Sequence, residues 1–184
     1  SSGRMGFAVA QAAAAAGHET TLVAGPVDLS TPSGVTRVDV ESAAEMLQAL
    51  RARWETAEAL VMVAAVADFK PAMRLPGKLK KAGRETLTLE LVRTPDILAE
   101  LARDKGKRKV VGFALETQDL LAEAFRKLTS KGLDAVVANS LENLGSDRAT
   151  ATWMEAGGAS ESWTNLAKPE LARRLVAALE RLPG

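Results

Sequence analysis

The residues best suited to chemistry in this chain stand at the end of an apolar run and shortly after it. Residues 60–67 read Leu-Val-Met-Val-Ala-Ala-Val-Ala and predict a buried strand that is apolar on both faces. The run ends at Asp68, and a short loop then leads to Lys78, Lys80 and Lys81. Ligands of open parallel sheets bind outside the carboxyl ends of the strands. An acid and several amines at that edge suit a phosphorylated, hydroxyl-bearing ligand such as a nucleotide.

The first six residues, Ser1 to Gly6, are a second candidate for phosphate binding. Glycines let the backbone approach a ligand closely, and the N–H groups at a helix N-terminus attract anions. An ordinary helix start explains the same segment, because a serine cap stabilises a helix by about 1 kcal/mol. Ser2, Gly3 and Gly6 are therefore candidates with two interpretations.

The other candidate residues also have a purely structural interpretation. Asp68 can cap a turn, and the three lysines can form a solvated loop. Residues 94–96, Thr-Pro-Asp, make a complete helix start with Thr as the cap and Pro at the first position. Phe113 ends an apolar strand and by default belongs to the core. Lys127 and Lys131 lie four residues apart in a last helical turn, where cations complement the helix dipole.

Composition narrows the possible functions. The chain of 184 residues has 24 basic and 23 acidic side chains, so its net charge of +1 gives no global field for nucleic acid or an anionic membrane. There is no apolar run of transmembrane length and no signal-peptide pattern. Cysteine is absent, which excludes disulfides and thiolate metal sites within these residues and is compatible with the cytoplasm.

The order of elements predicts one α/β domain over residues 1–184 with a mostly parallel sheet. We expect helices over 4–16, 43–54, 95–104, 118–131 and 168–182. We expect strands over 20–24, 35–38, 60–67, 86–91, 109–114, 134–138, 150–154 and 160–164. A doubly wound unit begins with a strand and places its glycine turn between that strand and the first helix. This chain begins at the turn, so we expect the first strand of the domain to be missing from it.

Five segments, in order, resemble the phosphopantothenoylcysteine synthetase (phosphopantothenate–cysteine ligase) family. They are Ser1 to Gly6 (SSGRMG), residues 64–69 with 78–81 (AAVADF and KLKK), 94–98 (TPDIL), 111–117 (VGFALET) and 137–139 (VAN). The match spans nearly the whole chain and is of the bacterial type. It implies a Rossmann-like fold with its site at the carboxyl ends of the strands. The family also carries an asparagine just ahead of the SSG motif, thought to hold the activated intermediate, and these residues do not include it.

The resemblance assigns the candidate residues to a nucleotide site. It implies that Lys78 is the catalytic lysine, which stabilises charge in the transition state, with Lys80 and Lys81 as a supporting field. It implies nucleotide contacts for a larger set: Ser2, Gly3, Gly6, Ala64, Asp68, Pro95, Asp96, Ile97, Leu98, Phe113, Lys127 and Lys131. The resemblance names no metal ligand.

The implied activity joins 4′-phosphopantothenate to L-cysteine through an acyl-cytidylate, with CTP as co-substrate and Mg²⁺, in coenzyme A biosynthesis. A homodimer is expected, and so is fusion to or assembly with a decarboxylase domain, which would hold any FMN. Two alternatives stay open: a nucleotide-binding regulatory or assembly domain without chemistry, and a Rossmann-type NAD(P)-dependent reductase. Against the reductase, residues 1–6 are not G-x-G-x-x-G and the chain has no tyrosine.

Overall fold

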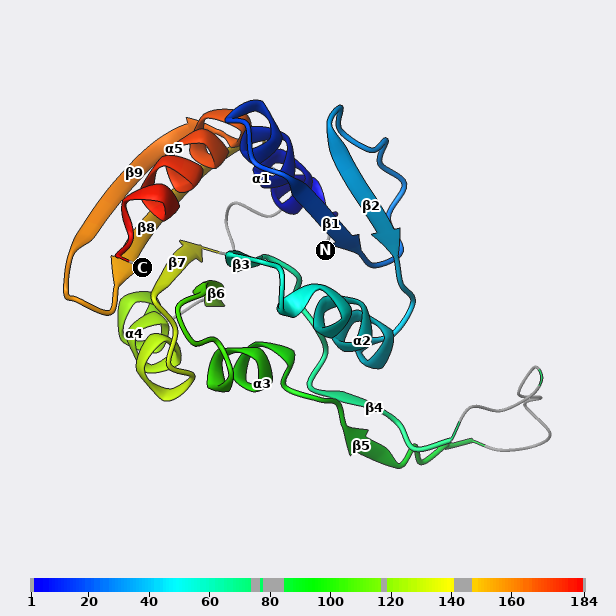
Figure 1. Ribbon diagram of the computed structural model, residues 1–184. Helices are drawn as coiled ribbons and strands as arrows, with labels where there is room; N and C mark the ends of the chain where they lie inside the picture. The colour runs from blue at the N-terminus through cyan, green and yellow to red at the C-terminus, as the bar shows by residue number, and fades with distance from the viewer. Residues whose placement is uncertain (1, 74–76, 78–84, 117–118, 141–146, 184) are drawn as a thin grey trace.

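The computed structural model describes residues 2–73, 77, 85–116, 119–140 and 147–183, which form five helices and nine strands (Figure 1). The helices are α1 (Arg4–Ala15), α2 (Ala43–Trp54), α3 (Ile97–Arg103), α4 (Leu120–Ser130) and α5 (Lys168–Arg181). The strands are β1 (Thr20–Ala24), β2 (Val35–Asp39), β3 (Ala59–Met62), β4 (Phe69–Pro71), β5 (Leu91–Arg93), β6 (Lys109–Glu116), β7 (Ala135–Ser140), β8 (Arg148–Glu155) and β9 (Ser160–Ala167). No described helix is long and apolar enough to cross a bilayer.

The largest sheet has the strand order β3-β6-β7-β8-β9. Its strands β3, β6 and β7 are parallel, and β8 and β9 add an antiparallel hairpin at one edge. Strands β1 and β2 form a separate parallel pair, and β4 and β5 form a short antiparallel ribbon that projects from the body (Figure 1). The predicted α/β class with parallel central strands is confirmed.

Helices cover both faces of the central strands, which explains why these strands are apolar throughout. Along β7, Ala135 and Val137 belong to the core under α1 and α5, whereas Val136 and Ala138 belong to the core under α2, α3 and α4. The first core also includes two tryptophans of the β8–β9 hairpin, whose ring centroids are 6.2 Å apart. The parallel strands therefore lie between two apolar layers.

The predicted strand over 60–67 is wrong in length. β3 pairs with β6 only through Met62, which lies opposite Gly112, and the chain then leaves the sheet. Ala64, Ala65 and Ala67 are exposed, and β3 itself is at most half-buried. One edge of β3 has no partner strand among the described residues.

The predicted strand over 86–91 is also misplaced. β5 covers Leu91–Arg93, because its partner β4 comprises only Phe69–Pro71 and fixes the register at those positions. Leu87, Leu89 and Leu91 have the alternation of a half-buried strand, yet they are 49%, 62% and 52% exposed. Alternation predicts which side chains share a face, but no core lies beneath this face.

Candidate functional site

The β4–β5 ribbon brings two distant segments together at the edge where β3 and β6 end. Phe69 pairs with Arg93, so the residues just outside the ribbon, Asp68 and Thr94, become neighbours. The Thr94 amide donates to the Asp68 carbonyl oxygen at 2.9 Å, and the Thr94 hydroxyl donates to the Ala67 carbonyl oxygen. The exposed Asp68 is thereby held beside the start of α3, and its carboxylate has no recorded partner among the described residues.

Helix α3 begins two residues later than the sequence predicts. Thr94 was expected to cap the helix with Pro95 as its first residue, but Asp96 is the cap, and its Oδ1 accepts from the Ala99 amide at 3.1 Å. The Thr94 hydroxyl instead donates to the Ala67 carbonyl oxygen and ties this turn to the backbone after β3. Ile97 and Leu98 follow as the first helical residues, and both side chains are buried.

Asp96 also forms an ion pair with Lys131 at the end of α4. Lys131 Nζ lies 2.8 Å from Asp96 Oδ2, and the two side chains are 27% and 51% exposed. Partial burial raises the pKa of Asp96. The hydrogen bonds from Lys131 and Ala99, with the charges of Lys131 and Lys127, outweigh burial and hold that pKa below its ordinary value of 3.8. The pair places one ammonium beside the start of α3 and keeps Asp96 ionised.

Lys127 reaches the same region from one turn earlier in α4. Its ammonium donates to the Phe113 carbonyl oxygen near the end of β6, which draws the half-buried Phe113 into this edge of the sheet. The approach is close because β6 carries glycine at position 112. A β-carbon there would lie 2.8 Å from a methyl of Leu133 and 3.0 Å from a methyl of Leu98. Gly112 therefore lets α3 and α4 pack directly on β6.

The start of α1 differs from the serine-capped helix that the sequence favours. Gly3 is the cap residue, with φ of 72°, and no side chain caps the helix. A β-carbon at Gly3 would lie 3.0 Å from a Val27 methyl, so both backbone conformation and space select glycine. A β-carbon added at Gly6 would lie 3.8 Å from the β-carbon of Val63, so Gly6 faces Val63. Ser2 is exposed beside this turn.

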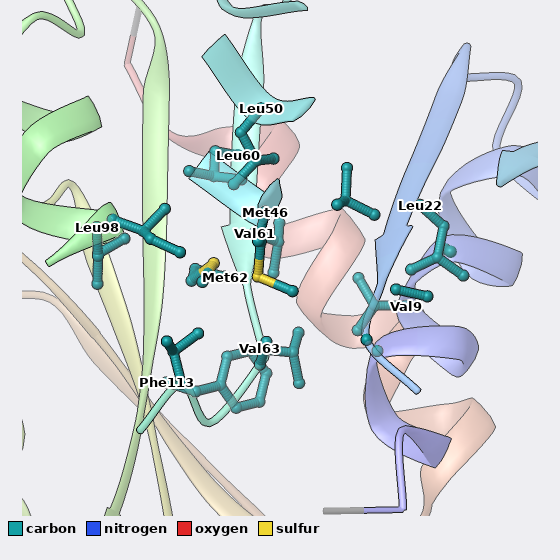
Figure 2. Close-up of a pocket in the computed structure, with 18 of the residues that line it drawn as sticks. Val9, Leu22, Met46, Leu50, Leu60, Val61, Met62, Val63, Leu98 and Phe113 are labelled. Atoms are coloured by element: carbon teal, nitrogen blue, oxygen red, sulfur yellow. The ribbon is translucent and has the colours of Figure 1, made fainter. Parts of the chain in front are cut away.

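All the described residues of the predicted site line one cavity of about 2020 Å³. These residues are Ser2, Gly3, Gly6, Ala64, Asp68, Pro95, Asp96, Ile97, Leu98, Phe113, Lys127 and Lys131. The cavity is larger than the about 300–1,000 Å³ of an ordinary ligand site, because it continues between β1 and β3. Figure 2 shows this apolar part, with Leu22 of β1 across from Val61 and Met62 of β3. The polar end and the apolar groove are thus different surfaces of one cavity.

The predicted catalytic residue, Lys78, and its neighbours Lys80 and Lys81 lie outside the described residues. Asn139, which the sequence analysis did not select, lines the cavity at the end of β7. The same sequence feature that indicated Asp68 could have indicated Asn139, because each is a polar residue that directly follows an apolar strand segment. The described residues contain no cluster of His, Cys, Asp and Glu that could hold a metal ion.

The polar end suits a ligand with separate anionic and hydroxyl groups, because it combines two lysines, a helix N-terminus and the exposed carboxylate of Asp68. Lys127, Lys131 and the first amides of α3 favour an anion such as a phosphate. The Asp68 carboxylate can accept from hydroxyl or amine groups. Phe113 offers a flat apolar surface nearby, which suits a base or sugar.

Comparison with known proteins shows the family of the chain. Residues 1–182 match the family described as DNA/pantothenate metabolism flavoprotein, C-terminal domain. The chain belongs to this family. The bifunctional coenzyme A biosynthesis protein of Vibrio parahaemolyticus is 46% identical over 143 residues, covering 77% of this chain and 36% of that protein. The chain spans about a third of the length of such curated relatives.

Solved structures of the family have the same fold. The C-terminal domain of a bifunctional coenzyme A biosynthesis protein superposes with a TM-score of 0.83 at 33% identity, covering 98% of this chain and 82% of that one. A mutant of Cab2, solved in complex with phosphopantothenate-cysteine, superposes with a TM-score of 0.76, covering 98% and 79%; at 16% identity it supports the fold alone. The predicted Rossmann-like fold and the predicted family are confirmed, whereas the individual contacts of each site residue stay predictions.

Proposed function

We propose that this domain joins 4′-phosphopantothenate to L-cysteine in coenzyme A biosynthesis, with CTP as the activating nucleotide. The match of residues 1–182 to the family carries the proposal, supported by relatives that are named for this pathway. The alternatives of a non-catalytic nucleotide-binding domain and an NAD(P)-dependent reductase have no comparable support.

The reaction takes two steps because a free carboxylate is a poor electrophile. In the first, a carboxylate oxygen of 4′-phosphopantothenate bonds to the α-phosphorus of CTP, and pyrophosphate leaves with the bonding electrons. In the second, the cysteine amine bonds to the acyl carbon, CMP leaves, and the amine loses a proton. Charge develops on phosphate oxygens in the first step, where positioned ammonium groups are most effective.

We assign the polar end of the cavity to the nucleotide. In this assignment Lys127 and Lys131 bind phosphate oxygens, the residues from Pro95 to Leu98 present backbone groups, and Asp68 accepts from the nucleoside. Gly3 and Gly6, with Ser2, provide a close backbone approach at the start of α1. Lys78 is proposed as the ammonium that stabilises the departing pyrophosphate. Mg²⁺ would accompany the triphosphate, mainly through phosphate oxygens and water.

Three further features belong to the same proposal. The working protein is a homodimer. It is fused to or assembled with a decarboxylase domain, which holds any FMN. It acts in the cytoplasm, which the lack of cysteine in this chain fits.

The test is nucleotide-dependent pyrophosphate release by the full-length protein. With 4′-phosphopantothenate and Mg²⁺, CTP should give one pyrophosphate per amide formed once cysteine is added, and ATP should be a poor substitute. Selection by hydrogen bonds to the base edge can discriminate by several kcal/mol, since the wrong base leaves buried groups unpaired. Equal turnover with ATP would contradict the CTP assignment. Nucleotide binding without pyrophosphate release would favour the non-catalytic alternative, and preference for NADPH would favour the reductase.

A further inference from the structure

The loop between β1 and β2 borders the cavity and has no regular structure of its own. Residues 25–34 form neither helix nor strand and return the chain from the end of β1 to the start of β2 (Figure 1). Gly25, Pro26 and Val27 line the cavity. Within the described part of the chain, no hydrogen bond joins the backbone of 25–31 to another backbone group. Side chains must therefore hold this segment in place.

Arg37 of β2 supplies hydrogen bonds to this loop. Its Nη1 donates to the Leu29 carbonyl oxygen at 2.5 Å, and its Nη2 donates to the Val27 carbonyl oxygen at 3.4 Å. Its Nε donates at 2.7 Å to Oδ1 of Asp39 in the same strand, which fixes the direction of the guanidinium. The Arg37 side chain is only 18% exposed. A planar guanidinium can hold two carbonyl oxygens and a carboxylate at once, whereas a lysine ammonium cannot reproduce this geometry.

The same guanidinium packs on the helix that begins beside the loop. Its central carbon lies 5.3 Å from the centre of the ring of Phe7, a buried residue of α1, which is within cation–π range. The Phe7 amide donates to the Gly3 carbonyl oxygen at 3.0 Å and so makes the first hydrogen bond of the helix. Gly3 itself lies against the loop, because a β-carbon there would be 3.0 Å from a Val27 methyl and 3.4 Å from a Leu29 methyl. The guanidinium therefore contacts both the loop and the helix where they meet.

We propose that Arg37 is a positioning residue for the candidate nucleotide site. It is not among the described residues that line the cavity, and it acts through the loop that it holds against Gly3. That contact fixes the backbone at the start of α1, where Ser2, Gly3 and Gly6 are assigned to the nucleotide. The proposal rests on the proposed function, because it takes CTP as the ligand of this backbone. Without the guanidinium the loop loses its hydrogen bonds, and the start of α1 is no longer kept in one conformation.

Kinetics of the full-length protein separates this role from a general loss of stability. Arg37→Gln should raise KM for CTP about tenfold and change kcat by less than about threefold, as expected when uniform binding is lost. KM for L-cysteine should stay within about twofold of the wild-type value. Arg37→Lys keeps the charge but not the planar fork, so its KM for CTP should stay raised. An unchanged KM for CTP in Arg37→Gln, or complete restoration by lysine, would overturn the proposal.

Arg108 provides a matched control at the opposite edge of the sheet, because it directly precedes β6, whereas the polar end lies where β6 ends. Its guanidinium carbon also lies 5.3 Å from the centre of an aromatic ring, that of Trp54, and its Nη2 donates to the Glu55 carbonyl oxygen at 3.2 Å. Arg108→Gln should lower stability in urea unfolding, as Arg37→Gln does, and leave KM for CTP at the wild-type value. An equal rise in KM for CTP in both variants would assign the effect to stability and overturn the proposal.

Hydrogen exchange and CTP binding test the role of Arg37 without turnover. Exchange of the amides in 7–10 should quicken at least about tenfold in Arg37→Gln and not in Arg108→Gln. The Kd for CTP in calorimetry should rise about tenfold in the same variant only. Unchanged exchange and Kd would overturn the role of Arg37 alone. A wild type that binds CTP but releases no pyrophosphate would overturn the proposed function alone, since the ratio of Kd values still decides the role of Arg37. A wild type that binds no CTP would overturn both.

Discussion

Asp96 is the residue through which α3 and α4 meet at the candidate site. Its carboxylate accepts from the Ala99 amide at 3.1 Å and lies 2.8 Å from the Lys131 ammonium. The contact with Ala99 caps α3. The contact with Lys131 holds this lysine, a candidate phosphate-binding residue, in position. The two roles can be separated by substitution, because asparagine caps helices well but carries no charge.

Asp96→Asn should therefore destabilise the protein only slightly at neutral pH, by at most about 1 kcal/mol, since the ion pair is partly exposed. Asp96→Ala loses the cap as well and should cost about 1 kcal/mol more. The folded protein holds the pKa of Asp96 below 3.8, so the stabilisation by the charge is complete above that pH and is lost as the pH falls below it. Urea unfolding at pH 7 and at pH 3 measures this: the difference between wild type and Asp96→Asn should shrink at pH 3. A constant difference would assign the effect to something other than the charge.

Lys78 is the residue on which the proposed chemistry depends most. If its ammonium stabilises charge that develops in the transition state, Lys78→Gln should lower kcat by about 100- to 1,000-fold and change CTP binding much less. Lys81→Gln is the matched control and should have a mild effect. Single-turnover pyrophosphate release in the full-length protein separates the two parameters. Wild-type turnover in the Lys78 variant would reduce this lysine to a solvated loop residue.

At the scale of elements, the packing of α3 against β6 determines the direction in which the N-terminus of α3 points. Gly112→Ala would place a methyl group 2.8 Å from a Leu133 methyl and 3.0 Å from a Leu98 methyl, so these side chains must move. Overpacking of this kind costs about 1–3 kcal/mol, and we expect that loss in urea unfolding together with weaker nucleotide binding. Gly157→Ala in the β8–β9 turn is the control, because nothing lies within 4 Å of the added carbon. Equal stability of the two variants would show that the side chains around Gly112 can move to make room for the added methyl group.

At the scale of the whole molecule, the apolar β4–β5 ribbon and the residues beside it favour the proposed homodimer. Leu91 begins β5, in a ribbon that stands away from the body, and Leu89 lies two residues before it; they are 52% and 62% exposed (Figure 1). Exposed apolar patches of this kind commonly mark protein interfaces. Leu89→Ser combined with Leu91→Ser should shift the protein from dimer to monomer in sedimentation equilibrium. Leu121→Ser, an equally exposed leucine on α4, should leave the dimer intact. A monomeric wild type would contradict the assignment.

The sequence by itself determined the order of most elements, because each has a local signal. Ser42 caps α2 and accepts from the Glu45 amide at 3.2 Å, Gly17 with φ of 93° follows the end of α1, and apolar runs mark β6 and β7. The five family segments also selected the residues that line the polar end of the cavity. Motifs could be recognised in this way because they are contiguous in the chain.

Only the tertiary structure decided where elements end and which side chains are paired. β3 stops at Met62, opposite Gly112 of β6, and β5 lies at Leu91–Arg93 because β4 fixes its register. Asp96 and not Thr94 caps α3, and the Thr94 hydroxyl donates to the backbone after β3. The Asp96–Lys131 pair joins residues 35 positions apart. Each of these outcomes depends on a neighbour distant in sequence, and local patterns carry no information about such neighbours.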